Sequence, residues 1–376
     1  MRAPHVVPPT ETGGVLHLLP VDTARGGQVY ARALVDALDA PAERHRILTL
    51  FDAPRFVLRA DVELGVRDGR LHRLGFDPRA TTRLCRVLRR LQPRVVVGHG
   101  AETVKYAAFA GLGNTPLVYY MVGSADPRLH RQPRRLLHSL YSRRATRIVA
   151  VSSDVADEAR RRLGISPDRL TVIPNGRDGT VYRPLPGERG SNPRIVFVGH
   201  MTTLKRPGLF LDAIEEVRRR GLSFNALMVG DGPLEASLRP RAERLDVEML
   251  GRRSDVPAIL GTSDILVFTS VAENEGMPGV LIEAGLCGVA VVSTAVPGAR
   301  DVIEHDRTGI IVGVDDRKGL IDALHRLVAD RSLSEEMGRR ARERCLAHFS
   351  FDESARLWSE LLDGLEGDAA EWRRHR

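Results

Sequence analysis

The chain has 376 residues, enough for about two domains, with 43% hydrophobic residues and a formal net charge of +8. Its three cysteines show no CxxC or Cys–His spacing, which excludes a disulfide framework and a zinc site and is typical of a reducing cytoplasm. The basic balance favours anionic ligands, but the arginines are dispersed and no nucleic-acid-binding motif occurs, so no nucleic-acid partner is expected.

Two segments resemble a membrane span or an export signal, but neither has the full pattern of one. The first 14 residues lack the apolar core of a signal peptide, and we expect a loose leader there. The longest apolar window, residues 279–298, is broken by Glu283, Cys287–Gly288 and Pro297–Gly298. It therefore predicts a short helix followed by a strand, and no membrane span.

Short β-branched runs alternate with amphipathic helical patterns from the start of the chain. Six runs in the first half predict buried strands, at 14–20, 45–51, 94–98, 116–120, 147–151 and 170–174. Helical patterns lie between most of them, for example at 26–38 and 152–164. Apolar runs without polar alternation are typical of parallel strands covered on both faces, so the pattern predicts a doubly wound α/β sheet.

A second α/β segment follows a stretch rich in Pro, Gly and charge. The alternation restarts with six runs, at 194–199, 224–230, 247–251, 264–270, 289–294 and 309–313. We therefore predict two facing Rossmann-like domains with parallel sheets, an N-terminal one (1–183) and a C-terminal one (194–349), joined by a linker (184–193). Helical patterns from about 332 to 366 end the chain, and we expect a C-terminal helix (350–376) to complete the N-terminal domain.

The loops after strands of the second half are the candidate binding site, because ligands of doubly wound sheets bind beyond the carboxyl ends of the strands. Lys205 follows the run at 194–199 and stands at the mouth of the next helix, beside Arg206. A lysine and the free amides of a helix start form an anion site. After the next run, Gly230 and Gly232 form a tight turn where a flat ligand can approach the main chain.

The segment ENEGMPGVLIEAGLCG (273–288) places one carboxylate, Glu283, inside an apolar run and a second, Glu275, ahead of a glycine turn. Pro278 suits the first position of a helix, and the turn from Gly276 to Gly279 can expose amides. A carboxylate can accept hydrogen bonds from the vicinal hydroxyls of a sugar. One carboxylate for each of two sugars, with phosphate between them, describes a nucleotide-sugar.

With these motifs the sequence resembles the family 4 glycosyltransferases of the GT-B fold. The motifs stand in the family's order: VIPNGRD (172–178), VGHMTTLKRP (198–207), MVGDGP (228–233), EGMPGVLIE (275–283) and HFSFDESARLW (348–358). The resemblance covers nearly the whole chain and is strongest from about 147 to 360. It implies transfer of a sugar, with retention of anomeric configuration and no metal or other cofactor. The donor would be a UDP-, GDP- or dTDP-sugar, and the acceptor a small molecule, a polysaccharide or a lipid-linked sugar.

The resemblance also implies roles for single residues. Glu283 would bind the donor ribose, Glu275 the donor sugar, and Lys205 the diphosphate. The full donor set is Gly26, Gly27, Gly199, His200, Lys205, Arg206, Gly230, Gly232, Leu250, Arg252, Glu275, Gly276, Met277, Pro278, Gly279 and Glu283. The acceptor set is Gly27, His99 and Asp126, and the predicted catalytic residues are Lys205, Glu275 and His99.

The sequence departs from the family pattern at two positions. His200 stands where the family usually has arginine, and we expect either His200, as imidazolium, or Arg206 to take that place at the diphosphate. Val122 stands where many members have a histidine near the reacting carbon, and Asp126 is only a weak substitute.

Other interpretations remain open. A nucleotide-sugar epimerase on the same scaffold would convert the donor without an acceptor, and a non-catalytic partner would only bind it. A nicotinamide dehydrogenase is not expected, because no G-x-G-x-x-G opens a helix after an early strand. The segment 128–147 carries seven arginines around several leucines. A solvated helix face is the favoured interpretation of it, and peripheral contact with the inner face of an anionic membrane is the alternative.

Overall fold

The protein is described from a computed structural model that covers residues 12–21, 26–38, 44–52, 60–67, 69–73, 75–123, 134–185, 190, 192–273 and 275–374. The chain forms two compact units, Met1–Ile173 with Ala355–Arg376, and Pro174–Ser354. The stretch 184–193 thus belongs to the second unit, where the Leu185 amide donates to the Gly261 carbonyl at 3.0 Å.

The first unit is built on a seven-stranded sheet in the order β3-β2-β1-β4-β5-β6-β7. All of the strand pairs described are parallel. The strands are β1 (Val15–Val21), β2 (His45–Phe51), β3 (Val62–Val66), β4 (Val95–His99), β5 (Leu117–Met121), β6 (Arg147–Ala150) and β7 (Leu170–Val172). Only β3 was not predicted, because its sequence VELGV is short and interrupts the apolar run with Glu63 and Gly65.

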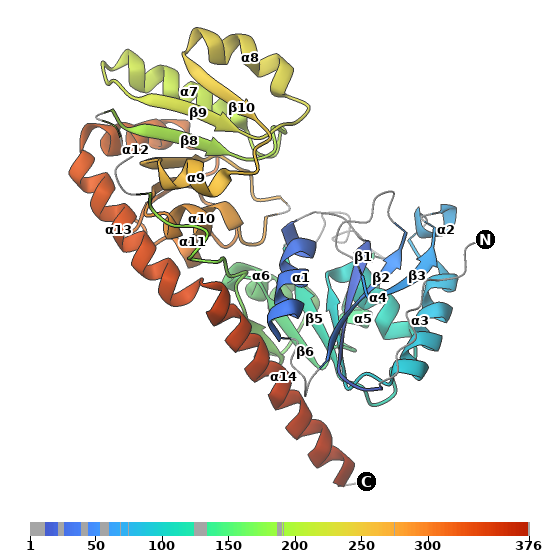
Figure 1. Cartoon of the computed structure of the whole chain (residues 1–376). Helices are drawn as coiled ribbons and strands as arrows, with labels where there is room; N and C mark the ends of the chain where they lie inside the picture. The colour runs from blue at the N-terminus through green and yellow to red at the C-terminus, as the bar shows by residue number, and fades with distance from the viewer. Residues whose placement is uncertain are drawn as a thin grey trace. The chain divides into compact units, whose positions relative to one another are not determined.

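Most of the described helices of the first unit lie between successive strands, and α14 comes from the end of the chain. These helices are α1 (Gly26–Leu38), α2 (Arg70–Arg73), α3 (Pro78–Leu91), α4 (Ala101–Phe109), α5 (Arg134–Ser142), α6 (Ser153–Glu158) and α14 (Phe351–Arg374). Helix α1 lies on one side of the sheet, and α3 and α4 on the other (Figure 1). Helix α14 closes the core with Trp358, Leu362 and Leu365, all buried. The Trp358 ring meets Tyr120 of β5 edge-on, with 5.1 Å between centroids.

The second unit contains a six-stranded parallel sheet in the order β10-β9-β8-β11-β12-β13. Its strands match the six predicted runs: β8 (Arg194–Val198), β9 (Asn225–Val229), β10 (Val247–Gly251), β11 (Ile265–Phe268), β12 (Ala290–Thr294) and β13 (Ile310–Val312). Strand β8 pairs with β9 on one side and with β11 on the other. The loops that leave β8 and β11 therefore diverge, and a crevice at such a switch point is where this type of sheet binds ligands.

The helices of the second unit are α7 (Pro207–Arg219), α8 (Glu235–Arg244), α9 (Val256–Gly261), α10 (Gly279–Leu286), α11 (Ala299–Val302), α12 (Arg317–Ala329) and α13 (Arg331–His348). Helices α7 and α8 lie on one side of the sheet and α9 and α10 on the other (Figure 1). The apolar window 279–298 forms α10 and β12, as expected. Among the residues described, no helix is both long and apolar enough to span a membrane.

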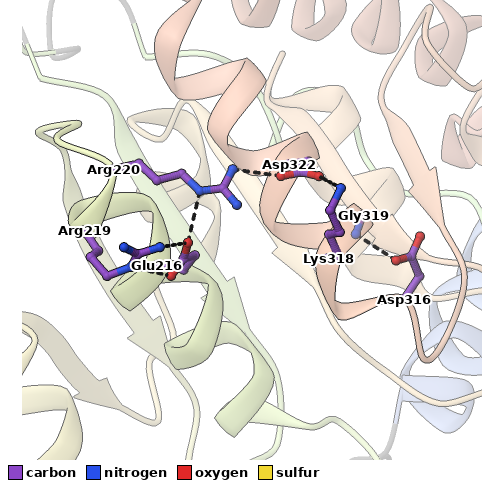
Figure 2. Close-up of polar contacts among 7 residues, drawn as sticks. All are labelled: Glu216, Arg219, Arg220, Asp316, Lys318, Gly319 and Asp322. Carbon is purple, nitrogen blue, oxygen red and sulfur yellow. Dashed lines mark hydrogen bonds and ion pairs between the residues drawn. The ribbon is translucent and has the colours of Figure 1, made fainter.

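Charged side chains join α7 to α12 on the surface of the second unit (Figure 2). Arg220, the residue that follows α7, donates to Glu216 of α7 at 3.2 Å and to Asp322 of α12 at 2.8 Å. Arg219 also binds Glu216, and Lys318 binds Asp322 at 2.9 Å. Hydrogen bonds from Arg219 and Arg220 lower the pKa of Glu216 to about 2. The two helices are thus linked by an alternating series of charges.

Candidate functional site

Lys205 and Glu275 meet at the switch point of the second sheet. Lys205 lies in the loop after β8, two residues before α7, and Glu275 lies in the loop after β11. The Lys205 Nζ donates to Glu275 Oε1, and the two side chains are only 29% and 12% exposed. The ammonium also lies 5.1 Å from the centroid of the Phe268 ring. The fold therefore brings together two predicted site residues that are 70 positions apart.

Hydroxyl groups fix both partners of this pair. The Ser270 Oγ lies 2.6 Å from Glu275 Oε1, so Ser270 and Lys205 hold the same carboxylate oxygen. The Thr269 Oγ1 donates to the Lys205 carbonyl at 2.7 Å, and the Thr294 Oγ1 donates to the Ser270 carbonyl at 2.6 Å. The side chains of Thr269 and Ser270, which directly follow β11, thus hold Lys205 and Glu275 in place. Ser270 was not among the predicted site residues.

Two of the predicted glycines let neighbouring loops touch through their main chains. Gly230 has φ +129° and Gly232 has φ +148°, which favour glycine. A Cβ atom at Gly230 would overlap the Gly199 carbonyl oxygen, and one at Gly232 would lie 2.7 Å from Met201 N and O. The structure shows that these glycines permit close packing of the protein's own loops, and their approach to a ligand stays a prediction.

His200 belongs to a small polar cluster with Asp231 and Arg252. The His200 Nδ1 lies 3.2 Å from Asp231 Oδ1, and the Arg252 Nε donates to Asp231 Oδ2 at 2.9 Å. The hydrogen bond from Arg252 lowers the pKa of Asp231, and His200 adds to the shift. Asp231 was missed in the sequence, although it follows β9 within the GDG turn and so stands at the carboxyl end of a strand.

Arg206 is directed to a different loop from His200. Its main chain is left-handed, with φ 49°, and it precedes the first residue of α7. Its Nη1 donates to the Val314 carbonyl at 2.6 Å and to Asp315 Oδ1 at 3.3 Å, in the loop after β13. His200 faces the loop after β9 instead. The two candidates for the missing arginine therefore hold their side chains on different neighbours.

Glu283 lies in α10 and is paired with Arg177. The Arg177 Nε donates to Glu283 Oε1 at 2.8 Å, and the Glu283 side chain is 15% exposed. Burial and the charge of Glu283 raise the pKa of the nearby Tyr182 to about 12. Arg177 stands in the VIPNGRD motif but was not predicted as a site residue, because a partner 106 positions away gives no local pattern.

The turn before α10 is supported by the loop after β12. The helix begins at Gly279, and Pro278 is its cap residue, so our expectation of Pro278 at the first helical position was wrong by one residue. A Cβ atom at Gly298, which has φ +75°, would lie 2.5 Å from the Gly276 carbonyl oxygen and 2.8 Å from Met277 Cα. Close packing of Gly298 therefore holds the turn from Gly276 to Pro278. Leu250, another predicted donor residue, is partly buried at the end of β10.

His99, a predicted residue of the first unit, lies at the switch point of its sheet, where β1 and β4 are neighbours. His99 ends β4 and is buried, and its Nε2 lies 3.0 Å from His17 Nδ1. The His17 Nε2 lies 3.1 Å from His45 Nδ1, so three neighbouring strands form a buried chain of imidazoles. Burial lowers the pKa of His99 to about 3, and burial with the neighbouring imidazoles lowers that of His17 well below its usual value.

The other predicted residues of the first unit are less defined. Gly26 and Gly27 open α1, and among the described residues, apart from its chain neighbours and the backbone of α1, no atom lies within 4 Å of a Cβ atom built at Gly27. Asp126 lies outside the described residues. Across the described ranges, no three His, Cys, Asp or Glu side chains form a group that could hold a metal ion.

Two families of known sequences match the chain, one in each half. Residues 24–180 match the family described as Glycosyltransferase Family 4, and residues 192–330 match Glycosyl transferases group 1. The chain belongs to glycosyltransferase family 4. This assignment agrees with the resemblance carried by the five sequence motifs.

Curated relatives of this family 4 member are similar over part of their length. The N-acetyl-alpha-D-glucosaminyl L-malate synthase of Bacillus anthracis is 30% identical over 213 residues, which are 54% of this chain and 55% of that protein. The UDP-Gal:alpha-D-GlcNAc-diphosphoundecaprenol alpha-1,3-galactosyltransferase of Escherichia coli is 24% identical over 281 residues, 69% of this chain and 72% of that protein. The match thus spans only about half the length of the first of these relatives.

Solved structures of similar architecture cover nearly all of the chain. HepE of Anabaena, crystallised with UDP, has a TM-score of 0.77 at 18% identity, over 93% of this chain and 100% of HepE. The same protein in complex with UDP-glucose has a TM-score of 0.75. At this level of identity the likeness shows the fold, which is GT-B.

Proposed function

We propose that the protein is a glycosyltransferase that moves a sugar from a nucleoside diphosphate to the hydroxyl of an acceptor. The observation that carries this proposal is the pairing of Lys205 with Glu275 at the switch point of the second sheet. A partly buried ammonium beside the start of α7 suits a diphosphate, because the first amides of a helix lack partners within the helix. Glu275 can accept hydrogen bonds from the hydroxyls of the transferred sugar.

The proposed donor extends from this pair to Glu283. The ribose hydroxyls would bind the Glu283 carboxylate, and the amides at the start of α10 would face the phosphates or the sugar. HepE, which shares the fold, was crystallised with UDP and with UDP-glucose, so a UDP-sugar is the first donor to test. Leu250 and Arg252, at the end of β10, are proposed to border the base.

The chemistry follows from the charge that develops in the reaction. As the bond from the anomeric carbon to the diphosphate breaks, negative charge grows on the leaving oxygen. Lys205 and the helix amides are fixed near that position before the reaction begins, and loss of one such contact typically costs about 3–4 kcal/mol. We propose retention of configuration, with the acceptor proton passing to an oxygen of the leaving diphosphate and the new glycosidic bond forming on the same face.

Purified protein incubated with UDP-, GDP- and dTDP-sugars tests the proposal. The expected result is release of free nucleoside diphosphate that depends on an acceptor extract and persists in EDTA. Conversion of the donor without acceptor would indicate an epimerase, and binding without conversion would indicate a non-catalytic protein. With an acceptor in hand, the anomeric coupling constant of the product in an NMR spectrum gives the stereochemistry, and inversion would contradict our mechanism.

Helix α5 supports a second, separate proposal, that the protein contacts an anionic membrane to reach a lipid-linked acceptor. Leu136, Leu137 and Leu140 are between 45% and 68% exposed, and the exposed Arg143 and Arg144 follow them. Leucines that enter the lipid and arginines that meet its head groups are typical of surface-binding helices. The Escherichia coli relative is named for a diphosphoundecaprenol-linked acceptor.

Co-sedimentation with vesicles tests the membrane proposal. We expect binding to phosphatidylglycerol vesicles that weakens in salt, and little binding to phosphatidylcholine vesicles. The double variant Leu136→Ser/Leu140→Ser should lose this binding, whereas Leu346→Ser, which changes an exposed leucine of α13, should keep it. Equal binding by both variants would exclude α5 as the contact.

A further inference from the structure

Arg177 is held by its main chain at the edge of the second unit. Its amide donates to the Phe349 carbonyl at 3.0 Å, and the Phe351 amide donates to the Arg177 carbonyl at 2.9 Å. These bonds form a parallel bridge between Arg177 and Ser350. The residue before it must be small, because a Cβ atom at Gly176 would overlap the Ser350 carbonyl oxygen and lie 2.7 Å from Phe351 Cα. The position of the Arg177 Cα is therefore fixed on both sides.

The side chain of Arg177 extends from this anchor to α10. Its Nε binds Glu283 Oε1 at 2.8 Å, and its Nη1 donates to the Gly176 carbonyl at 3.2 Å. The guanidinium also fills the space beside Gly279, where a Cβ atom would overlap Arg177 Nη2 and lie 3.0 Å from Cζ. Glycine at the first position of α10 thus makes room for the arginine.

The ion pair solves a local problem of α10. Ile282 and Ala284, the neighbours of Glu283 in the chain, are fully buried, and Glu283 itself is mostly buried. A partly buried carboxylate without a partner is unfavourable, and its rotamers would be free. The bond from Arg177 occupies one position on Oε1, and a carboxylate has about four acceptor positions. The arginine can therefore orient the group and still leave it able to bind a ligand.

We propose that Arg177 is a positioning residue of the donor site, which fixes Glu283 for the ribose diol and so makes the site select ribonucleotides. The inference rests on the proposed function, since it requires Glu283 to meet the donor ribose. Arg177 itself contacts neither donor nor acceptor. It acts through Glu283, from an anchor formed by residues 349–351 at the far end of the second unit's sequence.

Calorimetric titration separates this role from a purely structural one. The probes are UDP, GDP and ADP, each compared with its 2′,3′-dideoxy form, which lacks the diol. For the nucleotide that wild type prefers, we expect Arg177→Ala to lower the affinity for the ribose form about tenfold. Hydrogen bonds to charged groups contribute about that much or more to binding. The dideoxy form should bind to Arg177→Ala and to wild type with the same affinity. The Arg177→Ala/Glu283→Gln double variant should bind the ribose form as weakly as Glu283→Gln alone, because Arg177 acts only through Glu283.

Matched variants guard the interpretation. Arg177→Lys keeps the charge without the planar fork and should recover part of the diol preference. Arg183→Ala changes an exposed arginine of the same segment and should bind all probes as wild type does. Equal weakening of ribose and dideoxy forms by Arg177→Ala, or an unchanged diol preference, would overturn the inference and leave the proposed function standing. Failure of wild type to bind UDP, GDP or ADP, with binding of dTDP retained, would overturn the inference and leave the proposed function standing. Failure to bind any of the four nucleotides would overturn both.

Discussion

The main chain of Gly230 lies directly against the carbonyl group of Gly199. The Gly230 amide donates to the Gly251 carbonyl at 2.8 Å, while a Cβ atom on its other side would overlap the Gly199 oxygen. At the carboxyl edge of the sheet, the loops after β8 and β9 and the last residue of β10 are thus in contact at Gly230. Because φ is +129°, other residues are strained here even where space is available.

Gly230→Ala should therefore destabilise the second unit and impair ligand binding together. We expect the free energy of unfolding to fall by about 2–4 kcal/mol, from backbone strain and from the clash with Gly199. Urea unfolding followed by circular dichroism measures it. Gly221→Ala is the matched control, because Gly221 also has a positive φ, +87°, but open space around it. It should cost only about 1 kcal/mol, and equal losses in both variants would contradict the packing argument.

Removal of the Lys205 charge should reduce activity far more than stability. In Lys205→Met the developing charge on the leaving phosphate loses a fixed partner, so we expect kcat/KM for a nucleotide-sugar to fall roughly 100- to 1000-fold. Lys318→Met is the control, since Lys318 is highly exposed on α12, and it should keep wild-type kinetics. A Lys205→Met enzyme with near-normal kcat/KM would exclude the proposed role of the lysine.

The buried imidazoles predict that the first unit loses stability in mild acid. His99 has a folded pKa near 3, so between about pH 6.5 and pH 3 only the unfolded chain takes up its proton. The free energy of unfolding should therefore decrease as the pH is lowered through this range, by about 1.4 kcal/mol per pH unit for each such histidine. His99→Gln should flatten this slope in urea titrations between pH 7.5 and 5, and the exposed His348→Gln should not. Parallel slopes for wild type and His99→Gln would contradict the buried, neutral state.

The charges that link α7 to α12 should make a small, salt-dependent contribution. Arg220→Ala removes the bonds to both Glu216 and Asp322 (Figure 2), and we expect the Tm to fall by no more than about 2–4 °C in low salt. The pKa of Glu216 is lowered, so its stabilising effect exists above about pH 4.5 and is lost as the pH falls towards 2. Arg239→Ala, which breaks a pair within α8, is the control. The difference in Tm between wild type and Arg220→Ala should shrink in 0.5 M NaCl. A difference that persists in high salt would indicate that Arg220 stabilises the unit by packing instead of by charge.

Much of the fold could be predicted, because parallel strands covered on both faces have continuous apolar sequences. Twelve of the strands were located in this way, and β12 follows α10 where Cys287–Gly288 interrupts the apolar window. Strand β3 was missed because Glu63 and Gly65 break its pattern. The points where the chain passes between units, at Pro174 and Ser354, carry no comparable signal, since α14 runs through the second of them without interruption.

The candidate site could be predicted where chemistry and strand ends coincide, as for Lys205 and Glu275. It could not be predicted where a partner comes from a distant segment. Arg177 and Asp231 both stand in motifs that were recognised, yet their pairing with Glu283 and with His200 depends on the register of strands and on glycines that admit close approach. Which charged side chains pair with one another depends on the tertiary fold, and residue type alone does not predict it.

The hydrogen bond from Ser354 Oγ to the Pro174 carbonyl, at 2.7 Å, joins the first and last residues of the second unit. A segment whose ends touch is an insertion into the sequence of its host, and such a segment can be removed without stretching either part. A gene fragment for residues 174–354 should accordingly yield a self-contained folding unit. A short glycine bridge from Ile173 to Ala355 would restore the continuity of the remaining polypeptide.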